Sequence, residues 1–203
     1  MTPVLWPSPP WDEIDYWSLD LETGGLDPRR DAILAVGMVP VRAGTIRVGE
    51  AYQTLVQPQA QDAISAESVR THQLVPRDLR GAPALREVLR EVDRRLADGV
   101  LLVHQAAVDV RFLRHAHAAT GLRWGKPHVV DTVDLLVRLA KKARFIDPSA
   151  QDRLPNLNLS AARLRFGLPV YAAHDALVDA IAAAELFLVL RRALGAHTLR
   201  ELL

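Results

Sequence analysis

The sequence predicts an α/β fold in which a mixed β-sheet is flanked by helices. Three strand-like runs open the chain, and Ala43-Gly44 joins two of them in the manner of a β-hairpin. Beyond Pro58, apolar residues recur at helical spacing, and these segments alternate with short apolar runs that are typical of buried strands. No internal repeat or linker breaks this pattern. We therefore expect one domain over residues 1–203, with a Pro-rich N-terminal extension at residues 1–15.

The elements are expected in the order βββαα βα βα αα. The strands make a five-stranded sheet led by an antiparallel three-strand meander, and they are expected at residues 16–21, 32–41, 45–56, 100–103 and 129–131. The helices are expected at residues 65–74, 84–97, 108–120, 132–144, 159–166 and 175–194. A polar, Pro-containing segment at residues 145–156 is expected to be a loop.

The composition excludes several classes of protein. The 203 residues include no cysteine, which excludes disulfides, thiolate zinc sites and cysteine nucleophiles. A net charge of +1 excludes a polycation. No signal-peptide pattern is present at the N-terminus, and no apolar run approaches the roughly 20 residues that a membrane span needs. We expect a soluble, cytoplasmic protein that would hold any metal through oxygen or imidazole.

The first candidate site is a pair of carboxylates in the first strand. Side chains alternate along a strand, so Asp20 and Glu22 project from the same face of the sheet. The two charges repel each other and strands disfavour Asp, so a cation is expected between them. The alternative is a strand end at which both residues lie in solvent or pair with Arg29 or Arg30.

Two further candidate sites follow later in the chain. Asp109 lies near the start of a helix that follows a buried strand, where it would serve a site or simply complement the helix dipole. His174 precedes another helix, Asp175 is its expected N-cap, and Asp179 lies one turn further among apolar residues. Taken alone, His174 would be a surface or capping residue. Together, three acidic sites and one histidine match the needs of two-metal phosphodiester cleavage.

These residues resemble the three motifs of the DEDDh branch of the DnaQ-like exonucleases. Asp20-Leu21-Glu22-Thr23-Gly24-Gly25 resembles the family motif D-x-E-T-T-G. Residues 104–113 resemble H-N-A-x-F-D-x-x-F-L, and residues 174–179 resemble H-x-A-x-x-D. The motifs occur in the family order, and the resemblance extends over residues 17–194. Asp131-Thr132 and residues 159–169 are similar to two supporting segments of the family.

The resemblance implies an RNase H-like fold and a metal-dependent 3′→5′ exonuclease that releases nucleoside 5′-monophosphates. It implies that Asp20 bridges two Mg²⁺ or Mn²⁺ ions and that Asp109 serves the second ion. Glu22 and Asp179 would hold the ion that binds the attacking water, and His174 would be the general base. The physical chemistry agrees, because hard divalent ions prefer carboxylate oxygens and the pKa of histidine lies near working pH.

The resemblance also implies a substrate-binding side. Thr23 and Gly24 would offer backbone N–H groups near the 3′ hydroxyl, Leu26 would wedge against the terminal base, and His104 would contribute to substrate binding. The expected partner is nucleic acid, namely the 3′ end of single-stranded DNA, with RNA as the alternative. A DNA polymerase is a candidate protein partner, and no membrane is expected.

Three positions depart from the family motifs. Gln105 replaces Asn, Val108 replaces Phe, and Gly24 replaces Thr. We expect the first two to hold Asp109 somewhat differently and the third to loosen the first loop, although none removes an expected metal ligand. The competing hypotheses are an RNA-trimming nuclease, a nucleic-acid-binding module without catalysis, and a structural protein whose acidic residues are solvated.

Overall fold

The structure, a computed structural model, is an α/β fold built on one mixed sheet. It describes residues 8–58, 64–146, 155–172 and 174–203. The strands lie in the order β3-β2-β1-β5-β6, and β4 also pairs with β2. Their bounds are β1 Tyr16–Thr23, β2 Ile33–Arg42, β3 Thr45–Ile46, β4 Tyr52–Leu55, β5 Val100–Val103 and β6 Val129–Asp131. β1 is antiparallel to β2 and parallel to β5, which confirms the expected mixed sheet with a leading meander.

The expected third strand is divided in two, so the sheet has six strands instead of five. β3 pairs with the end of β2 and β4 pairs with its middle, while a short 3-10 turn at Val48–Glu50 leaves the ladder between them. The hairpin at Ala43-Gly44 is confirmed, and both of its residues have positive φ, at 47° and 69°. That backbone matches the twist of the flanking strands.

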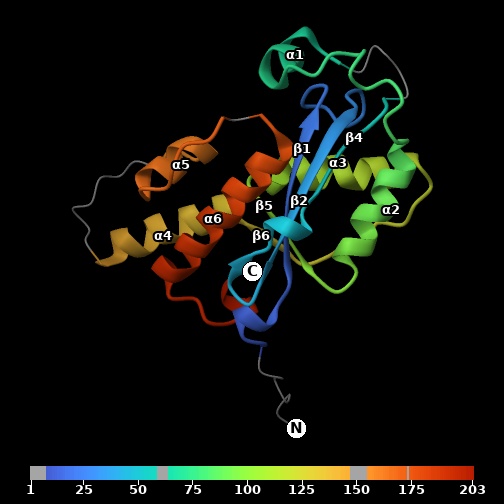
Figure 1. The fold of residues 1–203 in the computed structure, drawn as a ribbon. Helices are drawn as coiled ribbons and strands as arrows, with labels where there is room; N and C mark the ends of the chain where they lie inside the picture. Colours follow the sequence, from blue (N-terminus) through green and yellow to red (C-terminus); the bar gives the residue numbers. More distant parts are fainter. Residues whose placement is uncertain (1–7, 59–63, 147–154, 173) are drawn as a thin grey trace.

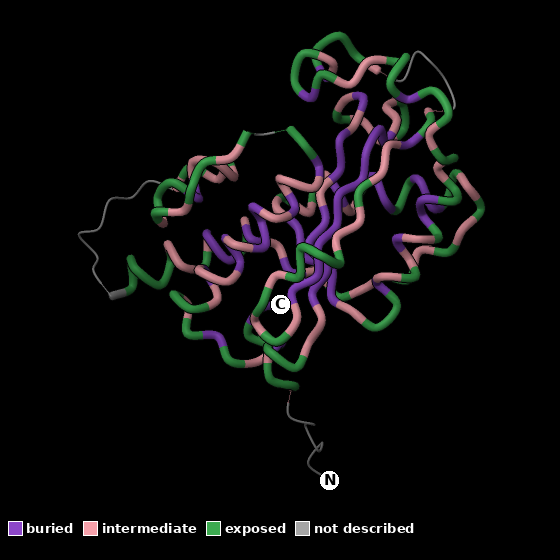
Figure 2. The backbone as a smooth tube through the Cα atoms, in the orientation of Figure 1, coloured by how far each residue is buried: buried purple, intermediate pink, exposed green. Residues whose placement is uncertain are grey.

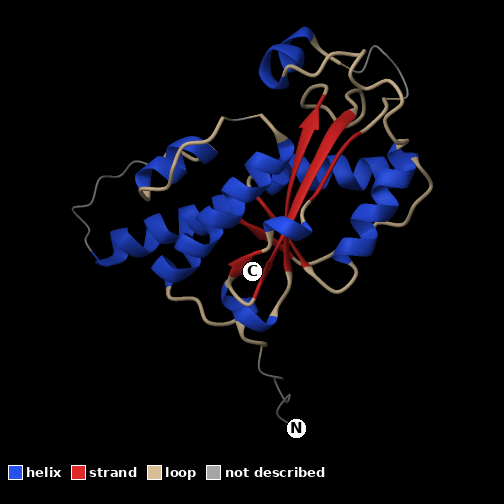
Figure 3. Ribbon diagram, in the orientation of Figure 1, coloured by secondary structure: helices blue, strands red, loops and turns tan. Residues whose placement is uncertain are grey.

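The helices cover the two faces of the sheet (Figure 1). α4, α5 and α6 lie on one side, α2 and α3 lie on the other, and α1 lies beyond the tip of β1. Their bounds are α1 Ala66–His72, α2 Leu85–Leu96, α3 Ala106–Ala119, α4 Thr132–Ile146, α5 Leu159–Arg165 and α6 Ala176–Leu194. Figure 3 shows the strands enclosed between these layers. Within the described residues, no helix combines the length and apolarity that crossing a bilayer requires.

Two expected segments fall partly outside the described residues. Most of the expected loop at 145–156 does so, as do residues 1–7 of the expected N-terminal extension. The rest of that extension packs on the domain: Pro10 bridges to Thr198, and the Trp11 ring lies under the Arg191 guanidinium at 4.1 Å. Residues 8–15 are therefore part of the body of the fold.

The residues of β1 alternate between two cores. Tyr16 packs on the α6 side, whereas Trp17, Leu19 and Leu21 pack on the side of α2 and α3. The Ser18 hydroxyl donates to the Ala180 carbonyl of α6 at 2.7 Å. Figure 2 shows this strand buried along most of its length. Since the alternation continues, the next two even-numbered side chains of β1 also face α6.

Gly37 lets α6 lie directly on the sheet. It pairs with Asp20 on β1 and with Gln53 on β4, so the three residues form a row across the strands on the face toward α6. A Cβ atom at Gly37 would lie 2.2 Å from the backbone of Ala176 and Leu177, the first residues of α6. Any side chain at this position would therefore push the start of α6 away.

We predict that Gly37→Ala destabilises the protein by about 1–3 kcal/mol or more, because the added methyl group overlaps backbone that cannot rotate aside. Strand propensity alone favours alanine over glycine, so a loss of stability would be due to the steric overlap with the backbone of α6. Urea unfolding midpoints measure the change. Gly49→Ala is the matched control, since nothing lies within 4 Å of its added Cβ, and we expect it to stay within about 0.5 kcal/mol of the wild type. Equal stability of the two variants would contradict the prediction.

Candidate active site

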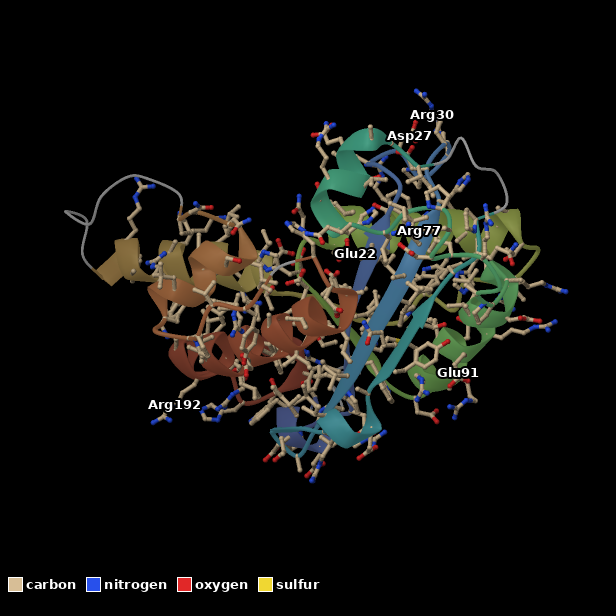
Figure 4. The ribbon with its side chains drawn as sticks, turned by 45° about the horizontal axis from the view of Figure 1, so that its top comes forward. Glu22, Asp27, Arg30, Arg77, Glu91 and Arg192 are labelled. Carbon is tan, nitrogen blue, oxygen red and sulfur yellow. The ribbon has the colours of Figure 1, made fainter. Side chains whose placement is uncertain are left out.

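Three carboxylates meet at the end of β1. Ligand oxygens of Asp20, Glu22 and Asp179 all lie within 4.8 Å of one another. The two β1 residues face α6 by strand alternation, and Asp179 enters from the first turn of that helix. Figure 4 shows Glu22 at the end of β1, with Asp27 and Arg30 further out. Among the described residues no ion pair joins this cluster to an arginine, so the alternative pairing is not observed.

Asp109 joins the cluster from the opposite side of the sheet. The ladder between β1 and β5 ends at Ser18, which leaves the next part of β1 open along that edge. The Asp109 carboxyl group accepts a hydrogen bond from the backbone of Leu21 there, and only 4% of the residue is exposed. Its charge is the strongest single charge acting on Asp20. The four acidic residues of the expected site are thus brought together.

Asp131 holds the start of α3, a role that the sequence did not reveal. Its carboxylate accepts the backbone N–H groups of Gln105 at 2.9 Å and Ala106 at 2.8 Å. Gln105 has a φ of 78°, a conformation that asparagine adopts more readily than glutamine. Gln105, which replaces the asparagine of the family motif, therefore strains the turn just before Asp109. Because Asp131 caps the helix, Asp109 is not needed for that purpose.

The cluster is electrostatically unfavourable by itself. Burial raises the pKa of Asp20 well above its usual range, and the charges of Asp109 and Glu22 raise it further. Burial, followed by the Asp179 charge, raises the pKa of Glu22 to about 7. Burial raises the pKa of Asp109 to about 8, although backbone hydrogen bonds oppose the shift. Carboxylate oxygens without thiolates suit hard divalent cations, which would favour the ionised forms.

His174 lies beside these carboxylates on a strained backbone. Its φ is 72°, its N–H donates to Asp179 Oδ2 at 2.8 Å, and the residue is exposed. Asp175 is the N-cap of α6, as expected, and accepts from Leu177 and Val178. The Gln53 amide donates to the same carboxylate at 3.1 and 3.2 Å. The start of α6 and the backbone of His174 are therefore fixed, while the imidazole faces solvent.

The structure gives His104 a structural role. Its Nε2 lies 2.8 Å from the Leu157 carbonyl, which only accepts, so Nε2 carries a proton. Its Nδ1 lies 2.7 Å from the Thr132 hydroxyl oxygen, which also lies 3.2 Å from the Val103 carbonyl, and burial lowers the pKa of the imidazole. Both nitrogens are occupied by the protein. His104 therefore fixes the segment that precedes α5, and its expected contact with a substrate stays a prediction.

The turn after Glu22 departs from expectation in part. The Gly24 N–H donates to the Ala32 carbonyl at 2.8 Å, so it is not available to a substrate as expected. The Thr23 hydroxyl is also engaged, since it donates to the Gly25 carbonyl at 2.7 Å. A side chain at Gly25 would overlap the carboxylate of Asp31, which closes the turn. Leu26 is 80% exposed at the tip of this turn.

A cavity of about 520 Å³ lies between this turn and α1. Glu22, Leu26 and His72 are among the residues that line it. His72 is buried, its Nδ1 accepts from the Leu74 N–H, and its Nε2 has no hydrogen-bond partner among the described residues. The sequence indicated only a helix at residues 65–74. His72 lies near the cluster because α1 is placed beside the tip of β1, and no local sequence pattern indicates that placement.

The comparisons with known proteins identify the family. The family model described as Exonuclease, of the RNase T type, matches residues 18–187. The chain belongs to this exonuclease family. Among relatives, it is 32% identical over 171 residues to the PolC-type DNA polymerase III of Thermotoga maritima, covering 84% of this chain and 11% of that protein. It is 33% identical to a DNA polymerase III subunit epsilon-like protein of Rhodobacter capsulatus, covering 94% of this chain and 25% of the relative.

Two solved nuclease structures share the fold. Escherichia coli Exonuclease I, in complex with a dA16 oligonucleotide, matches with a TM-score of 0.75 and 17% identity over 89% of this chain and 41% of that chain. Cell-death related nuclease 4 matches with a TM-score of 0.73 and 12% identity over 92% and 66% of the two chains. These matches confirm the RNase H-like fold, while the family model and the epsilon-like relative confirm the resemblance to DnaQ-like exonucleases. The chain spans only 11% and 25% of the length of the two relatives above.

We predict that the stability of the protein in EDTA falls as pH rises from about 5 to 8. The raised pKa values of Glu22 and Asp109 mean that the folded state holds protons that the unfolded state has already lost, so the pH increase favours unfolding. Saturating Mn²⁺ should remove this trend, because the ion binds the ionised carboxylates of the folded state. Urea unfolding midpoints at four pH values, with EDTA or Mn²⁺, measure both effects.

Two variants control this measurement. Asp109→Asn should flatten the fall in EDTA, because it removes one of the buried carboxylates. Asp134→Asn changes an exposed carboxylate in the first turn of α4 and should leave the slope unchanged. A wild-type stability that is flat or rises over this range would show that burial and mutual repulsion do not raise the pKa values of these carboxyl groups.

Proposed function

We propose that this chain is a metal-dependent 3′→5′ exonuclease of the DEDDh type, acting on the 3′ end of single-stranded DNA. The observation that carries the proposal is the convergence of four carboxylates, from β1, α3 and α6, beside the exposed imidazole of His174. We propose that the whole chain, residues 1–203, forms one exonuclease domain. Membership of an exonuclease family supports the reaction class.

In the proposed reaction, Asp20, Glu22, Asp109 and Asp179 hold two Mg²⁺ or Mn²⁺ ions. These ions would polarise the phosphate, favour ionisation of the attacking water and stabilise charge on the leaving oxygen. His174 takes a proton from the water as its oxygen bonds to phosphorus. The bond from phosphorus to the 3′ oxygen of the preceding nucleotide breaks, and that oxygen is then protonated. The products are a nucleoside 5′-monophosphate and a strand shortened by one nucleotide.

The cavity between the β1 turn and α1 is the proposed place for the terminal nucleotide. Glu22 lines it, so a nucleotide bound there would have its phosphate near the carboxylates. Leu26 offers an exposed apolar side chain to the base, and the imidazole of His72 lines the same cavity. An exposed leucine at a turn tip is costly in water, and covering it on binding recovers hydrophobic free energy.

The biological setting is a second part of the proposal. The names of the relatives include PolC-type DNA polymerase III and an epsilon-like subunit, which supports a DNA polymerase as a partner. The oligonucleotide complex of Exonuclease I supports single-stranded DNA as substrate. RNA remains the alternative substrate, and the experiment below distinguishes the two.

We predict that 5′-labelled DNA oligonucleotides are shortened stepwise from the 3′ end in Mg²⁺ or Mn²⁺ and stay intact in EDTA. Asp20→Asn should lower the rate by at least about 100-fold, because it removes the carboxylate central to the cluster. Asp134→Asn is the matched control and should digest at the wild-type rate. Gel ladders with DNA and RNA of the same sequence give the rates and the preferred sugar. Intact DNA and RNA that nevertheless bind the protein would favour the non-catalytic binding module.

We predict that Leu26→Ala raises KM for single-stranded DNA by about 10-fold while kcat changes little. The substitution removes most of the apolar surface that the terminal base would cover, which corresponds to about 1.5 kcal/mol. Initial rates over a range of DNA concentrations measure both constants. Val48→Ala removes a similarly exposed apolar side chain, on the short turn between β3 and β4, and should leave KM unchanged. A KM for Leu26→Ala equal to that of the wild type would exclude the base contact.

A further inference from the structure

A buried arginine lies behind the segment that leads to His174. Arg163 belongs to α5 and is 1% exposed. Its Nε and Nη2 donate to the Pro169 carbonyl at 3.2 and 2.7 Å, and its Nη1 donates to the Ala182 carbonyl of α6 at 2.7 Å. One side chain therefore links α5, the segment after it and α6.

Two further residues complete this network. Arg163 Nη2 lies 2.7 Å from Glu185 Oε2, and the Tyr171 hydroxyl donates to the other oxygen of the same carboxylate at 3.0 Å. The guanidinium also lies over the Tyr171 ring, 4.5 Å from its centre. The segment is thus held at Pro169 through its backbone and at Tyr171 through its side chain. We name these three residues, Arg163, Glu185 and Tyr171, the α5 clamp.

The α5 clamp limits where His174 can lie. Only two residues separate Tyr171 from His174, so this stretch spans at most about 11 Å. At its other end, the His174 N–H is held by Asp179. Within the described residues, no hydrogen bond holds the imidazole itself. His174 is therefore tied to the domain at its own N–H and lies only three residues along the chain from Tyr171.

Stability alone does not explain a buried arginine at this place. The desolvation of a buried ion pair offsets most of its attraction, and apolar side chains of similar size often serve as well. Arginine differs in geometry, because its planar fork directs several donors at once to fixed acceptors, which lysine cannot do. Here those acceptors belong to two separate segments of the chain, the segment after α5 and helix α6, while the arginine itself belongs to α5. Such an arrangement fixes the relative position of the segments.

We propose that the α5 clamp positions His174 for proton transfer from the attacking water, with Arg163 as its central residue. The proposal rests on the proposed function, in which His174 is the general base. Arg163 touches neither substrate nor metal in this view, and it acts only through the backbone that carries the histidine. Its loss should therefore slow the chemical step and leave substrate binding intact.

The test compares Arg163→Met with Arg165→Met in kcat, KM and thermal unfolding. Both arginines lie on α5, but Arg165 is exposed and, within the part of the chain that the structure describes, contacts only the ring of Phe166. We expect Arg163→Met to lower kcat by about 10- to 100-fold, because small misplacements of a catalytic group have effects of this size. KM should stay within about 2-fold of the wild-type value, because the α5 clamp does not contact the substrate. Arg165→Met should match the wild type in both constants.

A double-mutant cycle with His174→Ala separates positioning from general disruption. If the α5 clamp acts through the histidine, Arg163→Met should lower kcat by less than about 2-fold in the His174→Ala background. Tyr171→Phe removes only the hydroxyl that contacts Glu185, and it should give a smaller loss of kcat with the same dependence on His174. This milder variant carries the test if Arg163→Met does not fold.

The outcomes are distinct. Equal kcat values for wild type and the clamp variants would overturn the positioning role while leaving the proposed function intact. Losses that persist fully in the His174→Ala background would do the same, because they would show a general structural defect. A wild-type protein without turnover in Mg²⁺ or Mn²⁺ would overturn the proposed function and, with it, the role of the α5 clamp.

Discussion

The contact between α6 and the sheet at Gly37 is the constraint on which the candidate site depends. Since no side chain separates them, the first turn of α6 lies directly over the row formed by Asp20, Gly37 and Gln53. This closeness brings Asp179 within reach of the β1 carboxylates, and the amide of Gln53 holds the N-cap beside them. A helix raised by an ordinary side chain would leave the carboxylates too far apart to share a cation.

Bringing four carboxylates together costs free energy, and the surrounding structure is arranged to withstand that cost. Each contributing element is held by bonds outside the cluster: Asp131 caps α3, Gln53 holds the N-cap of α6, and Ser18 ties β1 to α6. Mutual repulsion would otherwise separate the elements. The raised pKa values therefore reflect the burial and the mutual repulsion that these supporting contacts must oppose.

The sequence predicted most of the fold from local patterns, and it predicted the acidic cluster from three motifs taken together and their resemblance to a known family. Strand alternation placed Asp20 and Glu22 on one face, and helix starts placed Asp109 and Asp179 at the edge of the sheet. The features that the sequence did not predict depend on contacts between segments that are distant in the chain. His72 belongs to the site only because α1 folds back over β1, and Gly24 loses its N–H to Ala32 across the turn. No pattern in the sequence indicates that both ring nitrogens of His104 form hydrogen bonds within the protein.

The structure also separates the parts that would perform chemistry from those that would select a substrate. The four carboxylates come from a buried strand and from two helix starts, whose positions are fixed by the core and by caps. Leu26 and the cavity wall come from a surface turn and the short helix α1, which few contacts tie to the sheet. Changes in the second group can alter the preferred nucleotide without moving the first. Gln105 belongs to the first group, because its positive φ strains the turn that precedes Asp109.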